Sequence, residues 1–103
     1  MRIVLRPEAR RDILLQIGYF ADEMAFEAAS RFQLAIEETM NKIQLRPGAG
    51  PPCVIAGAKW RGLRSWPVSE FEDIRVYYIQ ASRSLVRVIR ILHGKRDIYR
   101  ILQ

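Results

Sequence analysis

The chain has 103 residues, 50% hydrophobic and 27% charged, which predicts one folded domain over residues 1–103 and excludes a disordered chain. Its formal net charge is +6 at pH 7. Residues 1–58 carry seven Lys/Arg and seven Asp/Glu, whereas residues 59–103 carry ten and four, so the excess lies in the second half. Such a localised field favours an anionic partner, either nucleic acid or an acidic protein segment, over a solvated basic face without a partner.

Cysteine and histidine are too sparse for a disulfide or a metal site. Cys53 has no second cysteine to pair with, and the single histidine, His93, is forty residues away, so we expect no metal and no cofactor. The apolar run after Met1 is too short for a signal peptide, and no uncharged stretch approaches the roughly 20 apolar residues of a membrane span. We therefore expect a cytoplasmic protein that does not contact a membrane.

The first half of the chain predicts a short strand and two helices. The strand is expected at residues 3–5, and Pro7 suits the first turn of the helix that follows. Apolar residues of this helix recur every three or four positions, at Ile13, Ile17, Phe20 and Met24. After a connection near residues 21–23, a second helix has the apolar stripe Phe32, Ile36, Met40 and Ile43. These helices predict an antiparallel hairpin, which ends at a Pro/Gly loop over residues 46–52.

The second half predicts strands joined by short turns. From Trp60 to Trp66 the residues read as a strand or as a pair of short strand pieces, with Pro67 placing the strand end at a sheet edge. We expect a turn over residues 69–73, a strand over residues 74–79 and a hairpin turn over residues 81–84. The apolar residues after Arg96 fit a last helical turn or a short strand equally well.

Residues 85–93 predict a central strand, because apolar side chains occupy both of its faces. Strict alternation places Val86, Val88 and Leu92 on one face and Ile89 and Ile91 on the other. The order of elements predicts an α+β fold, in which an N-terminal strand and an antiparallel helical hairpin pack on a mostly antiparallel twisted sheet with a C-terminal three-strand meander.

The charged end of this strand, residues 93–97, is the compact cluster best suited to chemistry or to gripping a charged partner. It contains His93, Lys95 and Arg96, with Gly94 able to turn the chain at the sheet rim. A lone histidine at a strand end is more often a structural hydrogen-bonding group than a catalyst. The basic and aromatic residues of the second half together predict a surface for a target or an acidic peptide, made by Lys59, Arg61, Arg64, Trp66, Arg75, Tyr77, Lys95 and Arg96.

Three segments in this order resemble a known family. They are Gly62-Leu63-Arg64, then Arg75-Val76-Tyr77-Tyr78, then the ending Arg90 to Asp97 with the sequence RILHGKRD. With the strand and helices before them, they resemble the ParE branch of the RelE/ParE toxin superfamily, from Pro7 to Ile101. The resemblance implies a RelE/ParE-like fold and a bacterial cytosolic toxin. It also implies a cognate antitoxin, encoded beside the toxin, whose acidic amphipathic segment folds on it in a hetero-oligomer.

The resemblance leaves two activities open. Members similar to ParE inhibit DNA gyrase and block replication, which is the leading expectation, and the protein would then not be an enzyme. Members similar to RelE cut messenger RNA on the ribosome. For that alternative the resemblance points to Arg64 and Arg96 as phosphate-stabilising groups, with His93 as acid or base and Tyr99 nearby. Because the two branches share a fold, the fold alone does not choose between them.

Overall fold

The computed structural model describes residues 1–94, 96 and 98–102. Its elements are β1 (Arg2–Leu5), α1 (Pro7–Asp22), α2 (Phe26–Leu45), the 3-10 turn η1 (Ala58–Trp60), β2 (Arg64–Val68), β3 (Phe71–Ser82), β4 (Leu85–His93) and α3 (Ile98–Ile101). The four strands form one sheet in the order β1-β4-β3-β2. β1 runs parallel to β4, whereas β2, β3 and β4 form an antiparallel meander. The predicted α+β architecture is confirmed, and the undecided tail is a short helix.

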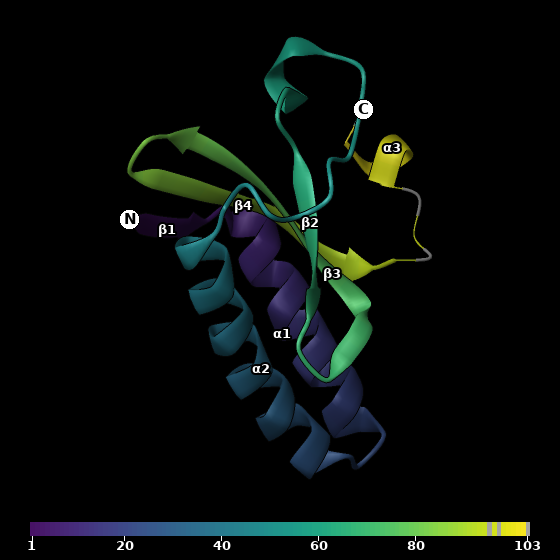
Figure 1. The fold of residues 1–103 in the computed structure, drawn as a ribbon. Helices are drawn as coiled ribbons and strands as arrows, with labels where there is room; N and C mark the ends of the chain where they lie inside the picture. Colours follow the sequence, from purple (N-terminus) through teal and green to yellow (C-terminus); the bar gives the residue numbers. More distant parts are fainter. Residues whose placement is uncertain (95, 97, 103) are drawn as a thin grey trace.

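The two long helices lie side by side on one face of the sheet (Figure 1). Pro7 occupies the first turn of α1, as predicted, because its missing N–H has no helical acceptor there. The predicted stripe of α2 is buried, and it joins the sheet in one core cluster. Within that cluster the rings of Phe20, Phe32 and Phe71 pack at centroid distances of 5.5–5.8 Å.

Met24 was expected on the apolar stripe of the first helix, and this expectation is wrong. α1 ends at Asp22, and Met24 adopts a left-handed φ of 56° in the connection, where 77% of its surface is exposed. Its backbone N–H donates to the carbonyl of Ala21, which turns the chain toward α2. The spacing of four from Phe20 therefore continues past the end of the helix, whereas the connection expected near residues 21–23 agrees with the end of α1 at Asp22.

A second apolar cluster covers part of the opposite face of the sheet. It consists of Ile55, Trp60, Leu63, Tyr77, Ile89, Leu92, Ile98 and Leu102. The strand expected from Trp60 is wrong in its first half, because residues 58–60 form a 3-10 turn and β2 starts at Arg64. The indole Nε1–H of Trp60 donates to the carbonyl of Leu102 at 2.8 Å, so this turn and α3 together cap the sheet. Figure 1 shows them across the sheet from α1 and α2.

An irregularity in β4 changes which side chains share a face. Tyr77 pairs with Arg90 but Tyr78 pairs with Val88, so Ile89 is an extra residue in β4. Such a bulge reverses the alternation beyond it. Ile91 consequently packs with the helix-side core, whereas Ile89 and Leu92 belong to the opposite cluster. The predicted grouping of Ile89 with Ile91, and of Leu92 with the valines, is therefore wrong.

Candidate functional site

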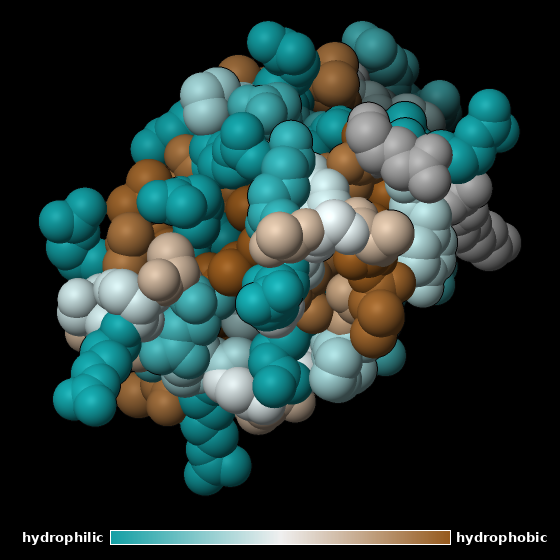
Figure 2. Space-filling model, turned by 90° about the horizontal axis from the view of Figure 1, so that it is seen from above, coloured by the Kyte–Doolittle hydropathy of each residue, from teal (hydrophilic) through white to brown (hydrophobic). Residues whose placement is uncertain are grey.

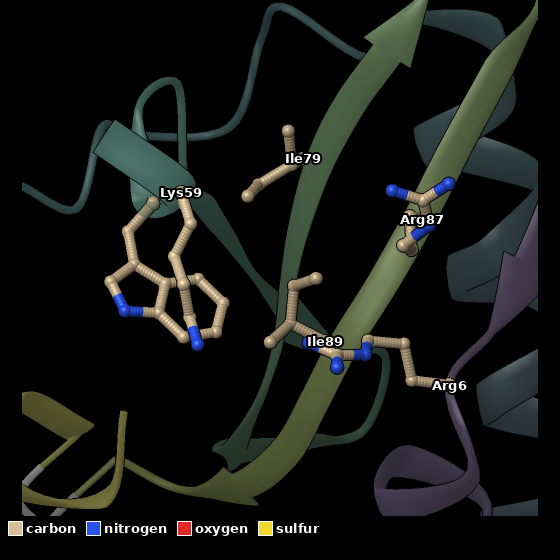
Figure 3. Close-up of a pocket in the computed structure, with 6 residues that line it drawn as sticks. Arg6, Lys59, Ile79, Arg87 and Ile89 are labelled. Atoms are coloured by element: carbon tan, nitrogen blue, oxygen red, sulfur yellow. The ribbon is translucent and has the colours of Figure 1, made fainter. Parts of the chain in front are cut away.

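A groove rimmed by cations lies on the face of the sheet opposite α1 and α2. It has a volume of about 360 Å³ and is lined by Arg6, Lys59, Trp60, Ile79, Arg87 and Ile89. Arg6 lies between β1 and α1, and the other lining residues come from η1, β3 and β4. Figure 3 shows Ile79 and Ile89 between Lys59 on one side and Arg6 and Arg87 on the other. We call this feature the cationic groove.

The register of the sheet explains why these side chains meet. Val4 pairs with Arg87, and Arg87 pairs with Ile79, so the three lie in one row across β1, β4 and β3. Residues in such a row project to the same face of a sheet. Two residues further along β4, the bulge residue Ile89 also projects to this face, as its packing with the second cluster shows. The floor of the groove is therefore aliphatic.

The cations of the groove differ in how far they are already paired. Arg6 lies 3.7 Å from Glu8, and both side chains are well exposed. The ammonium of Lys59 sits 4.9 Å from the ring centroid of Trp60, a cation–π contact. Within the described part of the chain, neither Lys59 nor Arg87 has a carboxylate within 4.0 Å. Two exposed cations of the groove are thus available to a partner, and a third has a long, exposed ion pair.

The wider surface mixes polar and apolar side chains. In Figure 2 hydrophilic residues surround exposed hydrophobic ones on the face seen from above. None of the helices in the described part of the chain has the length and apolar character that crossing a bilayer requires. Across the same described residues, His, Cys, Asp and Glu side chains nowhere gather in threes as a metal site would need.

Two arginines predicted to bind a partner have partners within the chain. The guanidinium of Arg64 donates to the carbonyl of Gly50 at 2.7 Å, and the hydroxyl of Tyr78 donates to the carbonyl of Pro47 at 2.7 Å. Together they hold the Pro/Gly loop against β2 and β3. Arg75 Nε donates to the hydroxyl oxygen of Ser65 at 3.0 Å, which ties β3 to β2.

The two aromatic residues named as binding candidates lie on opposite faces of the sheet. Trp66 packs against the helix-side core, and Tyr77 is 4% exposed in the second cluster. Burial raises the pKa of Tyr77. Arg61 is exposed next to η1, and Lys95 lies outside the described residues. Of the predicted binding residues that are described, Lys59 is the one that lines the cationic groove.

The candidate nuclease residues are spread over different regions. His93 and Arg96 line one hollow of about 200 Å³ beside α1, together with Leu15 and Tyr19. Arg64 is paired with Tyr78, whereas His93 is paired with Ile74, four positions away along β3 and hence roughly 13 Å distant along the strand. The structure brings His93 and Arg96 together and places Arg64 elsewhere. Tyr99, exposed on α3, does not line that hollow.

An internal ion pair lies at the point where β1 ends. Asp12 is buried, and its carboxylate accepts from Nε and Nη2 of Arg90 at 2.8 and 2.9 Å and from the backbone N–H of Ile91 at 2.9 Å. This hydrogen bonding to Asp12 raises the pKa of Arg90. Because the last pairing of β1 is Leu5 with Val88, the carboxylate satisfies an N–H of β4 beyond the reach of β1.

Sequence reasoning missed five residues of the groove, namely Arg6, Trp60, Ile79, Arg87 and Ile89. Ile79 and Arg87 both lie in segments predicted to be strands. The strand pattern could therefore have predicted which face of its own strand each side chain occupies. The bulge that turns Ile89 toward them depends on how β4 pairs with β3. Pairing between strands of unknown register could not be read from one sequence.

Comparisons with known proteins agree with this architecture. A family model described as ParE toxin of type II toxin-antitoxin system, parDE, matches residues 3–98. Among solved structures, one titled "Chromosomal ParDE TA system from P. aeruginosa" is similar, with a TM-score of 0.72 and 17% identity over 90% of this chain and 95% of that chain. No curated protein matches. The structural likeness shows a shared fold, and because the family match spans almost the whole sequence, the chain belongs to the ParE toxin family of type II toxin-antitoxin systems.

Proposed function

We propose that this chain inhibits DNA gyrase and so blocks replication, and that a cognate antitoxin neutralises it in the cytoplasm. The observation that carries the proposal is the match to the ParE toxin family over residues 3–98. Inhibition of gyrase by binding requires a surface and no catalytic residues. A mixed basic and apolar surface such as the one described above is compatible with that requirement.

The spread of the nuclease candidates supports this choice over cutting of messenger RNA. Cleavage at a 2′-hydroxyl needs an acid or base and a phosphate-stabilising cation around the same phosphate. Arg64 donates to the loop carbonyl of Gly50, and its strand position is roughly 13 Å along β3 from that of His93. His93 and Arg96 share a hollow with Leu15 and Tyr19, without a second described arginine.

The test compares two targets with one protein preparation. Purified protein is added to gyrase supercoiling and cleavage reactions, and in parallel to a translating extract in which messenger cleavage is mapped by primer extension. We expect loss of supercoiling with accumulation of cleaved DNA, and intact messenger in the extract. Mapped messenger cuts with unimpaired gyrase would overturn the proposal.

A pair of variants sharpens the comparison. His93→Gln and Arg96→Gln remove the two groups that share a hollow, and both side chains are exposed, so the fold should tolerate the changes. For a gyrase inhibitor, His93→Gln keeps gyrase inhibition within about threefold, because His93 is not among the residues predicted to bind the target and an exposed side chain outside an interface contributes little. For a nuclease, His93→Gln lowers the cutting rate by about a hundredfold or more.

A further inference from the structure

The hairpin that joins β3 to β4 extends beyond β2 at one end of the sheet. β2 pairs with β3 only as far as Tyr78, so in the described part of the chain residues 79–82 of β3 pair with β4 alone. Figure 1 shows this hairpin at the same end of the sheet as the N-terminus, away from α3. We call residues 80–84, with Arg2 and Arg87 beside them, the basic hairpin. Arg87 also lines the cationic groove.

The three arginines of the basic hairpin are exposed and have no internal partner of opposite charge. In the described part of the chain, no carboxylate lies within 4.0 Å of Arg2, Arg83 or Arg87. Arg2 and Arg87 project to the face opposite α1 and α2, because the strand residues next to them pack in the helix-side core. Arg83 lies at the turn between β3 and β4.

Backbone pairing fixes the three arginines relative to one another. The N–H of Arg2 donates to the carbonyl of Ser84 at 2.8 Å, which holds the start of β1 against the turn. Arg2 is paired with Leu85, so Arg87 lies two residues, roughly 7 Å, further along the strands. The N–H of Ser84 also donates to the hydroxyl oxygen of Ser82 at 3.2 Å, which closes the turn. The charges are therefore presented by a hydrogen-bonded backbone, and little ordering is needed on binding.

Acidic residues lie at the other end of the sheet. Residues 46–94 include three of them, Glu70, Glu72 and Asp73, all at or beside the turn between β2 and β3. Asp73 and Arg83 lie near opposite ends of β3, roughly 30 Å apart along the strand. That distance is several times the Debye length of about 8 Å at physiological salt, so these carboxylates do not cancel the positive potential of the basic hairpin.

We propose that the basic hairpin contacts the phosphate backbone of duplex DNA without regard to base sequence. Arg2, Arg83 and Arg87 each neutralise a phosphate, and the hydroxyls of Ser82 and Ser84 donate to phosphate oxygens beside them. The inference deepens the proposed function and rests on it in one respect, that the DNA contacted in the cell is the DNA bound by gyrase. Binding to DNA itself can be tested without gyrase.

The polar character of the basic hairpin favours nucleic acid over an acidic protein. Residues 80–84 are all exposed, and their sequence, Gln-Ala-Ser-Arg-Ser, has no large apolar side chain. A protein interface gains most of its affinity from a buried centre with aromatic or apolar anchors, which this segment lacks. Phosphates, by contrast, are bound by arginine, serine and glutamine side chains. A protein partner would therefore gain little here beyond weak exposed ion pairs.

Three phosphate contacts predict a definite salt dependence. Each phosphate neutralised on a duplex releases counterions and contributes about 0.9 to the slope of log K against log salt. We expect a slope of about −2.7, so that Kd rises about fortyfold between about 50 and 200 mM salt. Contacts of this kind add affinity for a gyrase–DNA complex without selecting a base sequence.

Fluorescence anisotropy with a labelled duplex of mixed sequence measures the binding on the full chain over a range of salt concentrations. Arg2→Gln and Arg83→Gln each remove one exposed cation, and Arg31→Gln makes the same change in net charge on α2. Each hairpin variant should raise Kd by about fivefold or more and reduce the salt slope by about one, whereas Arg31→Gln should stay within about twofold. Circular dichroism checks that the three variants keep the fold.

Competition with polyglutamate separates a phosphate surface from a surface for acidic protein. At equal concentration of charge, polyglutamate should displace little of the duplex, because a duplex carries a charge about every 1.7 Å, twice the density of an extended chain. Displacement of the duplex at equal charge, with Arg83→Gln weakening both ligands alike, would assign the surface to an acidic protein and refute the inference. Equal salt slopes for wild type, Arg2→Gln and Arg83→Gln would refute it as well.

Gyrase reactions with the same proteins keep this outcome apart from that of the proposed function. Where both proposals hold, Arg2→Gln and Arg83→Gln should need several-fold more protein than wild type to accumulate cleaved DNA. If both variants weaken duplex binding but wild-type protein leaves gyrase unaffected, the gyrase proposal fails and the DNA contact stands. If wild-type protein inhibits gyrase while both variants bind the duplex as tightly as wild type, the DNA contact fails and the gyrase proposal stands.

Discussion

Asp12 contributes to stability through three hydrogen bonds, two from the guanidinium of Arg90 and one from the backbone N–H of Ile91. Its side chain is 4% exposed and that of its partner Arg90 is 22% exposed, so the pair is largely withdrawn from water. A buried charge that loses its partner is costly, whereas a pair at the surface contributes little. The location of a charge in the fold therefore decides its effect more than its identity does.

We expect Asp12→Asn to lower the free energy of unfolding by about 2–4 kcal/mol, because the guanidinium of Arg90 would stay partly buried without a carboxylate. Urea denaturation followed by circular dichroism measures the change. Glu8→Gln, which removes the exposed 3.7 Å contact to Arg6, serves as the control and should cost less than about 1 kcal/mol. Equal losses in the two variants would mean that burial of the Asp12 pair is unimportant.

Tyr78 gives the protein a pH dependence in the alkaline range. Burial raises the pKa of Tyr78 above its ordinary value of 10.0. Below pH 10 the folded and unfolded chains both keep the phenolic proton, so the stabilising contribution is complete. Above that pH the unfolded chain loses the proton first, and stability falls until the folded phenol also ionises.

Tyr78→Phe should therefore be less stable at pH 7, by about 1 kcal/mol, because it lacks the hydrogen bond to the carbonyl of Pro47. Its stability should nevertheless decline less steeply than that of wild type above pH 10, because it has no proton to lose at this position. Denaturation midpoints from pH 7 to 11 test this. Parallel curves for the two proteins would contradict the assignment of the pH dependence to Tyr78.

At the scale of the elements, two glycines illustrate opposite roles. Gly18 lies in the middle of α1, and an added Cβ there would have no atom within 4 Å. Gly50 lies in the Pro/Gly loop, and a Cβ there would overlap the hydroxyl of Tyr78 and approach the carbonyl oxygen of Ser65 to 2.7 Å. Gly18 lowers the stability of α1, because glycine loses more conformational entropy on folding than other residues do. Gly50 lets the loop approach the sheet closely, because it has no Cβ.

Gly18→Ala should accordingly raise the free energy of unfolding by about 0.5–1 kcal/mol. Gly50→Ala should lower it by about 1–3 kcal/mol, because the loop must move away from Tyr78 and Ser65. Thermal unfolding of both proteins beside wild type provides the comparison. A stabilised Gly50→Ala would show that the loop can shift without loss of its contacts.

Helices and strands could be predicted from the sequence where the information is local. The stripe from Phe32 to Ile43 repeats with the period of a helix, so both the helix and its buried face were predictable. The lengths of the strands were harder to predict. β3 extends from Phe71 to Ser82 and so includes part of the turns expected on either side. Those ends are fixed by pairing with β2 and β4, which is not local information.

The candidate site was less predictable than the fold, for the same reason. Lys59 could be named from its place in a basic stretch, but Arg6 lies in a segment with balanced charge and joins the groove only because β1 pairs with β4. Arg64 looked equally basic, yet its guanidinium is engaged by the carbonyl of Gly50. Which cations are free depends on contacts between residues far apart in the sequence.

At the scale of the whole molecule, β1 joins the sheet through the strand pairing that is most distant along the sequence. Arg2 pairs with Leu85, so β1 joins β4 across nearly the full sequence, whereas the meander is joined by short turns. Closing a long loop costs more entropy than closing a short one, and distant pairings form late for that reason. We infer that the meander and helices assemble before β1 docks.

Ile3→Ala should test this order of assembly. Ile3 packs against the helix-side core, so its truncation should lower the free energy of unfolding by about 2 kcal/mol. We expect faster unfolding with a nearly unchanged folding rate, a φ value below about 0.3. Val76→Ala in the meander should give a higher φ value in the same stopped-flow experiment. A φ value for Ile3 that equals or exceeds that of Val76 would place β1 in the folding nucleus.

The carboxylate of Asp12 also occupies a backbone N–H that another molecule could otherwise use for strand pairing. A sheet edge with a bare donor can template another strand and so begin a fibre. At Ile91, just beyond the end of β1, that donor is occupied from within by a negatively charged group on a helix. The short first strand can therefore stop after four residues without leaving its neighbour open to polymerisation at this position.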